Sequence, residues 1–183
     1  MHCRFAATPF RPAIGYSEAV RCRLYRPEDF DALYAIEEIC FELRDRFSRS
    51  YMRQLIQQPN AATWIAEDDE CESDQAAGAA RMCGFAIVDW SRESSGVVAY
   101  IQTLEVLPAG RGRGIGGALL DALENSARDA GAKSVWLHVE ATNAAAIRLY
   151  ESHGFRLEGR QEGYYGRDRA ALIYAKPLSL RHA

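Results

Sequence analysis

The chain has 183 residues, of which 48% are hydrophobic and 26% are charged, and its formal net charge is −3. This composition is typical of a single globular domain, and the acidic balance argues against a nucleic-acid partner, which usually selects an excess of basic residues. No apolar run approaches the roughly 18 residues that cross a membrane, and no signal-peptide pattern is visible, so we expect no membrane partner and, by default, a cytoplasmic location.

The cysteines form no recognisable framework. Their number, 5, is odd, and no two are spaced as Cys-x-x-Cys, so we expect neither a disulfide framework nor a zinc site. Incidental thiols in a reducing compartment are the simplest interpretation, and no metal is expected. The cysteines are Cys3, Cys22, Cys40, Cys71 and Cys83.

The first half of the chain predicts an arm, two helices and four strands. Residues 1–19 have no period and are expected to be an irregular arm, before a single domain at 20–178 and a short tail at 179–183. The acidic, alanine-rich segment 68–81 is expected to be an exposed, mobile loop. Alternation predicts strands at Val20–Arg26, Ala62–Glu67, Met82–Trp90 and Val97–Leu107, and helical spacing predicts helices from Pro27 to Cys40 and at Ser50–Gln57.

The second half predicts two helices and three strands. A helix from Gly114 to Ala130 ends at Gly131, a natural C-terminal cap. The remaining elements are a strand at Ser134–Val139, a helix at Asn143–His153, and strands at Phe155–Arg160 and Ala170–Lys176. This order favours a mixed α/β sheet with helices packed against it.

The most informative stretch is Arg111–Gly116 (RGRGIG), which lies between a predicted strand and a predicted helix. A helix that begins in a glycine-rich loop presents unpaired N–H groups and its positive dipole end, which suits a phosphate. A P-loop is excluded because it needs a lysine that this loop lacks. A dinucleotide fingerprint is matched by Gly112, Gly114 and Gly117, but the ribose-binding acid about 20 residues further on is missing. A plain packing turn is the other alternative, although the two arginines suit an anionic ligand better.

The loop also matches a third pattern, Arg/Gln-x-x-Gly-x-Gly/Ala, and residues 143–155 read Asn-x-x-Ala-x-x-x-Tyr-x-x-x-Gly-Phe. With these motifs the chain resembles the GCN5-related N-acetyltransferase (GNAT) superfamily over about Val20–Lys176, and within it the RimI-type and other protein N-terminal acetyltransferases. The resemblance implies a mixed, mostly antiparallel sheet that is split in the middle and flanked by about four helices. It also implies acetyl-CoA as co-substrate.

The resemblance further implies where the cofactor binds. Backbone N–H groups of the Arg111–Gly116 loop would hold the pyrophosphate, and Asn143 would hydrogen-bond the pantetheine arm. A bulged strand segment, Leu104–Val106, would leave backbone groups free for the same arm. The implied cofactor-binding residues are Leu104, Glu105, Val106, Arg111, Gly112, Arg113, Gly114, Ile115, Gly116, Gly117, Asn143 and Tyr150.

Amine acetylation by direct attack in a ternary complex needs a base for the amine and an acid for the departing thiolate. By the resemblance, Tyr150 is the general acid. His138 stands where the RimI branch usually has a glutamate, and it resembles a eukaryotic branch in which a strand histidine and a tyrosine of the previous strand, here Tyr100, relay the proton through a water. Glu105 is a competing base. From the residues alone, Tyr150 and His138 could instead be core residues, and Tyr100 a rim aromatic.

The acceptor end is predicted from two segments. Tyr164 and Tyr165 resemble the tandem tyrosines that line the peptide slot of N-terminal acetyltransferases, and Phe41 and Leu43 fall where that group places the opposite wall. The tyrosines could instead form a hairpin rim. The favoured acceptor is the α-amine of a protein or peptide, with a ribosomal protein as one candidate. A small amine such as a polyamine or amino sugar, a lysine side chain, and a non-catalytic CoA-sensing module are the alternatives. A monomer or homodimer is expected.

Overall fold

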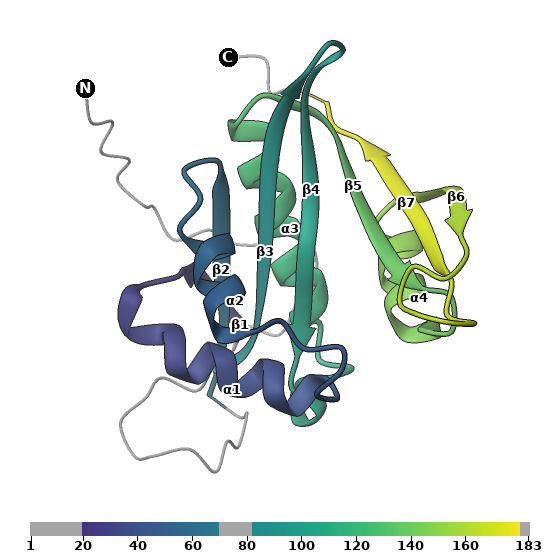
Figure 1. The fold of residues 1–183 in the computed structure, drawn as a ribbon. Helices are drawn as coiled ribbons and strands as arrows, with labels where there is room; N and C mark the ends of the chain where they lie inside the picture. The colour runs from purple at the N-terminus through teal and green to yellow at the C-terminus, as the bar shows by residue number, and fades with distance from the viewer. Residues whose placement is uncertain (1–19, 70–81, 180–183) are drawn as a thin grey trace.

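Seven strands form one sheet, and four α-helices pack against it in this computed structural model, which describes residues 20–69 and 82–179 (Figure 1). All the elements predicted from the sequence are present, and their ends lie within three residues of the expected ones. The elements are β1 (Val20–Leu24), α1 (Phe30–Cys40), α2 (Arg49–Ile56), β2 (Ala61–Asp68), β3 (Met82–Glu93), β4 (Gly96–Val106), α3 (Ile115–Asp129), β5 (Ala132–Glu140), α4 (Ala144–Ser152), β6 (Arg156–Gln161) and β7 (Ala171–Pro177), with 3₁₀ turns at Pro27–Asp29 and Pro108–Gly110.

Some predictions fall outside the described residues. The expected arm at 1–19 and the end of the expected tail cannot be compared, and the expected loop at 68–81 begins later, because Asp68 still belongs to β2. Cys22 and Cys40 are free thiols, and the thiol of Cys83 donates to the Asp68 carbonyl at 3.7 Å. In the described part of the chain, no helix is long and apolar enough to cross a membrane, and no three metal-binding side chains are grouped so that they could hold an ion.

The sheet is split between β4 and β5. Its strand order is β1-β2-β3-β4-β5-β7-β6, and every neighbouring pair is antiparallel except β4 and β5. This parallel pairing ends at Tyr100 and Trp136, and beyond it the two strands diverge, as Figure 1 shows. The mixed, mostly antiparallel, split sheet predicted by the resemblance is thus confirmed.

A β-bulge in β4 decides which side chains face which helix. Ile87 pairs with Thr103 and Val88 with Ile101, so that Gln102 is an extra residue. The bulge had been expected at Leu104–Val106, which was wrong by two residues. A bulge reverses the alternation of side chains along its strand. Tyr100, Thr103 and Glu105 therefore share the face that α1 covers, while Leu104 points toward α3.

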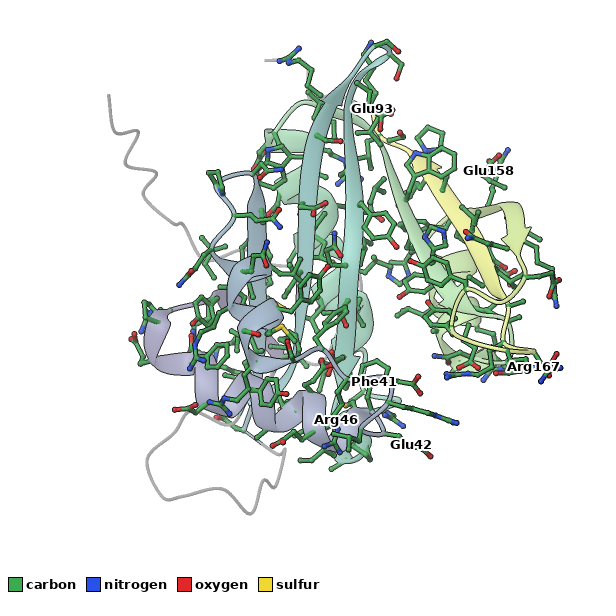
Figure 2. All side chains as sticks on the ribbon, in the orientation of Figure 1. Phe41, Glu42, Arg46, Glu93, Glu158 and Arg167 are labelled. Carbon is green, nitrogen blue, oxygen red and sulfur yellow. The ribbon has the colours of Figure 1, made fainter. Side chains whose placement is uncertain are left out.

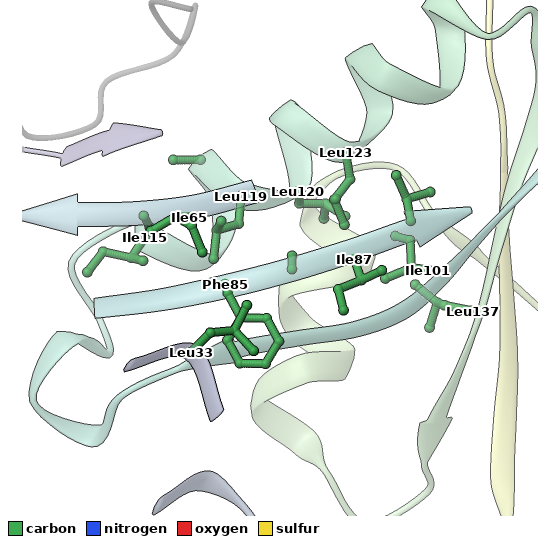
Figure 3. Packing of buried hydrophobic residues seen from close by; sticks show 14 of the residues in the cluster. Leu33, Ile65, Phe85, Ile87, Ile101, Ile115, Leu119, Leu120, Leu123 and Leu137 are labelled. Carbon is green, nitrogen blue, oxygen red and sulfur yellow. The ribbon is translucent and has the colours of Figure 1, made fainter. Parts of the chain in front are cut away.

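The core fills both faces of the sheet. Behind the sheet, Leu119, Leu120 and Leu123 of α3 are completely buried (Figure 3). In front of it, Leu33 of α1 lies beside Phe85 of β3 in the same view, and both are fully buried. Burial of such side chains stabilises a fold by about 1.5–3 kcal/mol each. Both faces of the sheet are therefore well packed beside the split.

Candidate active site

The glycine loop has the backbone that an anion seat requires. Gly112 and Gly114 have φ angles of +77° and +83°, a left-handed conformation that glycine adopts at little cost. Gly114 is the N-cap of α3 and has no side chain to bond the N–H groups of the first turn. Those groups are consequently left for a ligand, and the positive end of the α3 dipole lies behind them.

The two arginines of this loop do different things. Arg111 lies beside the loop, and its Nε donates to the carbonyl of Val106 at 3.1 Å. The Arg113 guanidinium turns away and pairs with the completely buried carboxylate of Asp68 at 2.9 Å. Arg113 therefore fastens the loop to β2, and of the two arginines it is Arg111 that lines the cavity beside the loop.

A cavity of about 450 Å³ connects the glycine loop with the split in the sheet. Its wall contains every predicted cofactor-binding residue except Arg113 and Tyr150, and it also contains Phe41. The lining residues are Cys40, Phe41, Leu104, Glu105, Val106, Gly110, Arg111, Gly112, Gly114, Ile115, Gly116, Gly117, Asn143, Ala145, Ala146 and Leu149. Sequence reasoning missed Cys40, Gly110, Ala145, Ala146 and Leu149. The small residues at the start of α4 were the only sequence signal for any of them.

Asn143 and Gly116 show why a narrow ligand fits this cavity. The Asn143 Oδ1 caps α4 by accepting from the N–H of Ala146 at 3.1 Å, which orients its amide nitrogen. At Gly116, an added Cβ would lie 3.1 Å from Leu149 and 3.8 Å from Leu104. The glycine thus lets α3 approach both walls closely. Polar groups at the ends and apolar sides between them suit a long, thin molecule that carries a pyrophosphate.

Tyr100 and His138 meet across the split. The Tyr100 hydroxyl lies 2.8 Å from His138 Nδ1, and which of the two donates depends on the histidine tautomer. Burial raises the pKa of Tyr100, and a hydrogen bond with Tyr164 raises it further. Burial lowers the pKa of His138 from its usual 6.5. Both groups are therefore neutral near pH 7, and a neutral imidazole can accept a proton.

The tandem tyrosines complete an aromatic cluster around this pair. The ring of Tyr164 stacks on His138 with centroids 4.4 Å apart and planes 5° from parallel. Tyr165 meets Tyr164 edge-on at 4.8 Å. Tyr150 is buried, and its pKa is raised first by burial and then by nearby Tyr165. The structure thus gathers Tyr100, His138, Tyr150, Tyr164 and Tyr165, which come from β4, β5, α4 and the β6–β7 loop.

The other predicted wall lies across from this cluster. Phe41 and Glu42 lie at the end of α1, on the side that faces the β6–β7 loop with Arg167 (Figure 2). Phe41 is 38% exposed, Leu43 is 83% exposed and Tyr164 is 43% exposed. Leu43 and the two tyrosines do not line the cofactor cavity, which sets the two ends of the candidate site apart.

A second buried carboxyl group lies against the carboxyl of Glu105. It is 3% exposed, and its Oε1 accepts from the Thr103 hydroxyl at 2.9 Å. Glu37, 1% exposed, accepts from the backbone N–H of Phe47 at 2.7 Å. Burial raises the pKa of Glu105 well above its usual range, and the adjacent Glu37 carboxyl raises it further through a hydrogen bond. Two buried carboxyls in contact can share one proton, so Glu105 holds its proton to a higher pH than an exposed carboxyl does. Its role as a competing base stays a prediction.

Comparison with known proteins agrees with this geometry. The model of the acetyltransferase (GNAT) family matches residues 30–155. The chain is 40% identical over 86 residues to the ribosomal protein bS18-alanine N-acetyltransferase of Escherichia coli K12, which covers 45% of this chain and 57% of that protein. It is 36% identical over 100 residues to the streptothricin acetyltransferase of Streptomyces lavendulae, which covers 54% of this chain and 52% of that protein. The chain thus spans little more than half the length of these curated relatives.

Solved structures extend the similarity to nearly the whole chain. The ribosomal-protein-S18-alanine N-acetyltransferase of Escherichia coli superposes with a TM-score of 0.72 at 26% identity, covering 89% of this chain and 96% of that one. Arabidopsis thaliana NAA60 in complex with a bisubstrate analogue superposes with a TM-score of 0.74 at 23% identity, covering 88% and 99%. At 23% identity, the similarity to NAA60 shows a shared fold and nothing beyond it.

Proposed function

Because the chain belongs to the acetyltransferase (GNAT) family, we propose that it transfers the acetyl group of acetyl-CoA to the N-terminal α-amine of a protein or peptide. Acetyltransfer follows from the family. The α-amine acceptor is supported by the similarity to the bS18-alanine N-acetyltransferase and by the fold shared with structures that hold bisubstrate analogues. A ribosomal protein is one candidate acceptor.

The cavity accounts for binding of the co-substrate. In the proposal, the backbone N–H groups at the start of α3 and the Arg111 side chain hold the pyrophosphate, and the Asn143 amide bonds the pantetheine arm. The edge of β4 beyond Tyr100, which β5 leaves without a strand partner, would hold that arm. When bound, acetyl-CoA supplies an activated acetyl group as a thioester.

The hydrogen-bonded pair of Tyr100 and His138 is the observation that carries the proposal. His138, neutral at pH 7 and fixed by the Tyr100 hydroxyl and the Tyr164 ring, takes a proton from the attacking amine directly or through a water held by the pair. Tyr150 delivers a proton to the sulfur that departs, and then regains one from solvent. Its raised pKa keeps it protonated until that moment, as a general acid requires.

The acceptor would enter between Phe41 and Leu43 on one side and the tandem tyrosines on the other. These side chains offer exposed apolar and aromatic surface, which suits the first side chain of a peptide. The α-amine then points toward His138, because Tyr164 contacts both the slot and the imidazole.

A small amine is the second candidate acceptor. The 36% identity to the streptothricin acetyltransferase favours it, since that relative is named for an antibiotic. A slot whose named walls are aromatic and apolar discriminates weakly between acceptors of similar size.

One assay separates the two candidates. Acetyl-CoA consumption is measured with a panel of peptides that differ in their first residue, with the same peptides blocked at the α-amine but carrying one lysine, and with streptothricin and a polyamine. We expect turnover with free α-amines only. If the enzyme acetylates streptothricin or the polyamine but none of the peptides, the protein acceptor is refuted.

A further inference from the structure

Arg169 forms an ion-pair network at the mouth of the proposed acceptor slot. Its Nε and Nη2 donate to the two carboxylate oxygens of Glu140 at 2.7 and 3.0 Å. Its Nη1 donates to the Asp45 carboxylate at 2.7 Å and to the Tyr165 carbonyl at 3.3 Å. The backbone carbonyl of Arg169 in turn accepts from the Tyr165 N–H at 3.2 Å.

The partners of Arg169 come from three segments of the chain, and two of them are distant from it in the sequence. Asp45 lies in the α1–α2 loop, four residues after Phe41 of the first proposed wall. Tyr165 belongs to the β6–β7 loop, which forms the second wall. Glu140 ends β5, two residues after His138 and on the same face of that strand. A single guanidinium therefore joins both walls to the strand that carries the proposed base.

The chemistry of this contact requires arginine. The planar guanidinium has five donors, so it can bond one carboxylate with two parallel N–H groups and still reach a second carboxylate. A lysine ammonium is a point charge on a flexible stem, and it cannot hold both acids in a fixed geometry. The side chain of Arg169 is 23% exposed, and those of Asp45 and Glu140 are 20% and 29% exposed, so solvent only partly screens the network.

We propose that Arg169 is a positioning residue that sets the width of the acceptor slot by bracing the α1–α2 loop against the β6–β7 loop and β5. The proposal rests on the acceptor slot proposed above. Arg169 acts through the segments it holds, because a displacement of the β6–β7 loop moves Tyr164 away from His138. The co-substrate cavity shares none of the four residues of the brace, so acetyl-CoA binding should not depend on them.

The test measures KM and kcat for both substrates with the best peptide acceptor of the wild-type enzyme. The variants are Arg169→Ala, Arg169→Lys, Asp45→Asn and the double variant Asp45→Asn/Arg169→Ala. Arg160→Gln is the matched control, because Arg160 lies on the same hairpin and its Nε pairs with Glu162, two residues away, at 2.5 Å. Thermal unfolding of each variant is followed alongside.

We expect Arg169→Ala to raise the KM for peptide roughly tenfold and Asp45→Asn roughly threefold, with the KM for acetyl-CoA changed less than about twofold. Arg169→Lys should recover only part of the loss. The double variant should be no worse than Arg169→Ala, since both changes break one brace. Arg160→Gln should behave as wild type.

The outcomes separate this inference from the proposed function. If the wild-type enzyme acetylates no peptide, the proposed function fails and the brace fails with it. If the wild-type enzyme is active and the variants keep its KM for peptide, only the brace is overturned. Equal increases in KM for both substrates, or additive losses in the double variant, also overturn it, because they indicate a general structural role.

Discussion

The buried pair of Glu37 and Glu105 makes the stability of this enzyme depend on pH in an unusual direction. Because the pKa of Glu105 is raised in the folded state, the folded protein retains a proton that the unfolded chain releases above about pH 4.3. The stability that this proton contributes is complete below the unfolded pKa, and it is lost as the pH rises toward the folded pKa. Glu105→Gln should remove this dependence, since an amide N–H can donate to Glu37 where the shared proton does.

The magnitude follows from one proton. A difference of one bound proton lowers the free energy of unfolding by about 1.4 kcal/mol per pH unit, and thus by about 2.7 kcal/mol between pH 5.5 and 7.5 as an upper limit. For a chain of this size, 1 kcal/mol shifts Tm by about 2–4 °C. Arg169 lowers the pKa values of Asp45 and Glu140, so their contributions are lost only at more acidic pH. The lowered pKa of His138 affects the stability of wild type and of Glu105→Gln equally, so it cancels in the difference between their stabilities.

The assay is urea unfolding of wild type and Glu105→Gln at half-unit steps between pH 5.5 and 7.5. We expect the stability of the variant relative to wild type to increase steadily with pH. Glu124→Gln is the matched control, because Glu124 is 2% exposed but pairs with Lys176 at 2.7 Å. Its loss should be about 1–3 kcal/mol and nearly constant with pH. Parallel wild-type and Glu105→Gln curves would refute the shared proton.

Three further predictions concern catalysis and the cavity. Tyr150→Phe should lower kcat by about 10²–10⁴-fold while CoA binding by calorimetry persists, and a normal rate would remove Tyr150 from the mechanism. His138→Ala should abolish the acidic limb of the pH–rate profile. In wild type the midpoint of this limb should lie below the usual histidine pKa of 6.5, because burial lowers the pKa of His138. An unchanged limb in the variant excludes His138 as the base. Gly116→Ala should raise the KM for acetyl-CoA several-fold, because its Cβ would lie 3.1 Å from Leu149, and Leu149→Ala should relieve the effect; independence of the two changes would contradict the close approach.

The sequence was sufficient for the elements and for much of the site. Hydrophobic periodicity located the helices and strands, because each buries one face against the sheet. Alternation along β5 puts His138 and Glu140 on one face, opposite the buried Leu137 and Val139. The motifs assigned the glycine loop and Asn143 to the same ligand, and both line the same cavity.

What the sequence could not show were contacts between distant segments. Nothing local indicates that the Arg113 side chain pairs with Asp68, which lies 45 residues earlier. Glu105 is an ordinary carboxylate in the sequence, and only the fold shows that it is buried with Glu37 against it. The resemblance put the bulge at Leu104–Val106, and the alternation of side chains could not correct this, because it contains no mark for the extra residue at Gln102.

The bulge at Gln102 also limits how this enzyme can be engineered. Loops tolerate changes in length, but the number of residues between Tyr100 and the glycine loop is fixed by two requirements. Tyr100 must point to the face where His138 lies, and its hydroxyl must lie at the right position along the strand. Deletion of Gln102 would leave composition and hydrophobicity almost unchanged, yet it would turn Tyr100 to the α3 side, away from His138. A two-residue change would restore the face but displace the hydroxyl by about 6.6 Å along the strand. Point substitutions at Gln102 should therefore be far better tolerated than any insertion or deletion in this stretch.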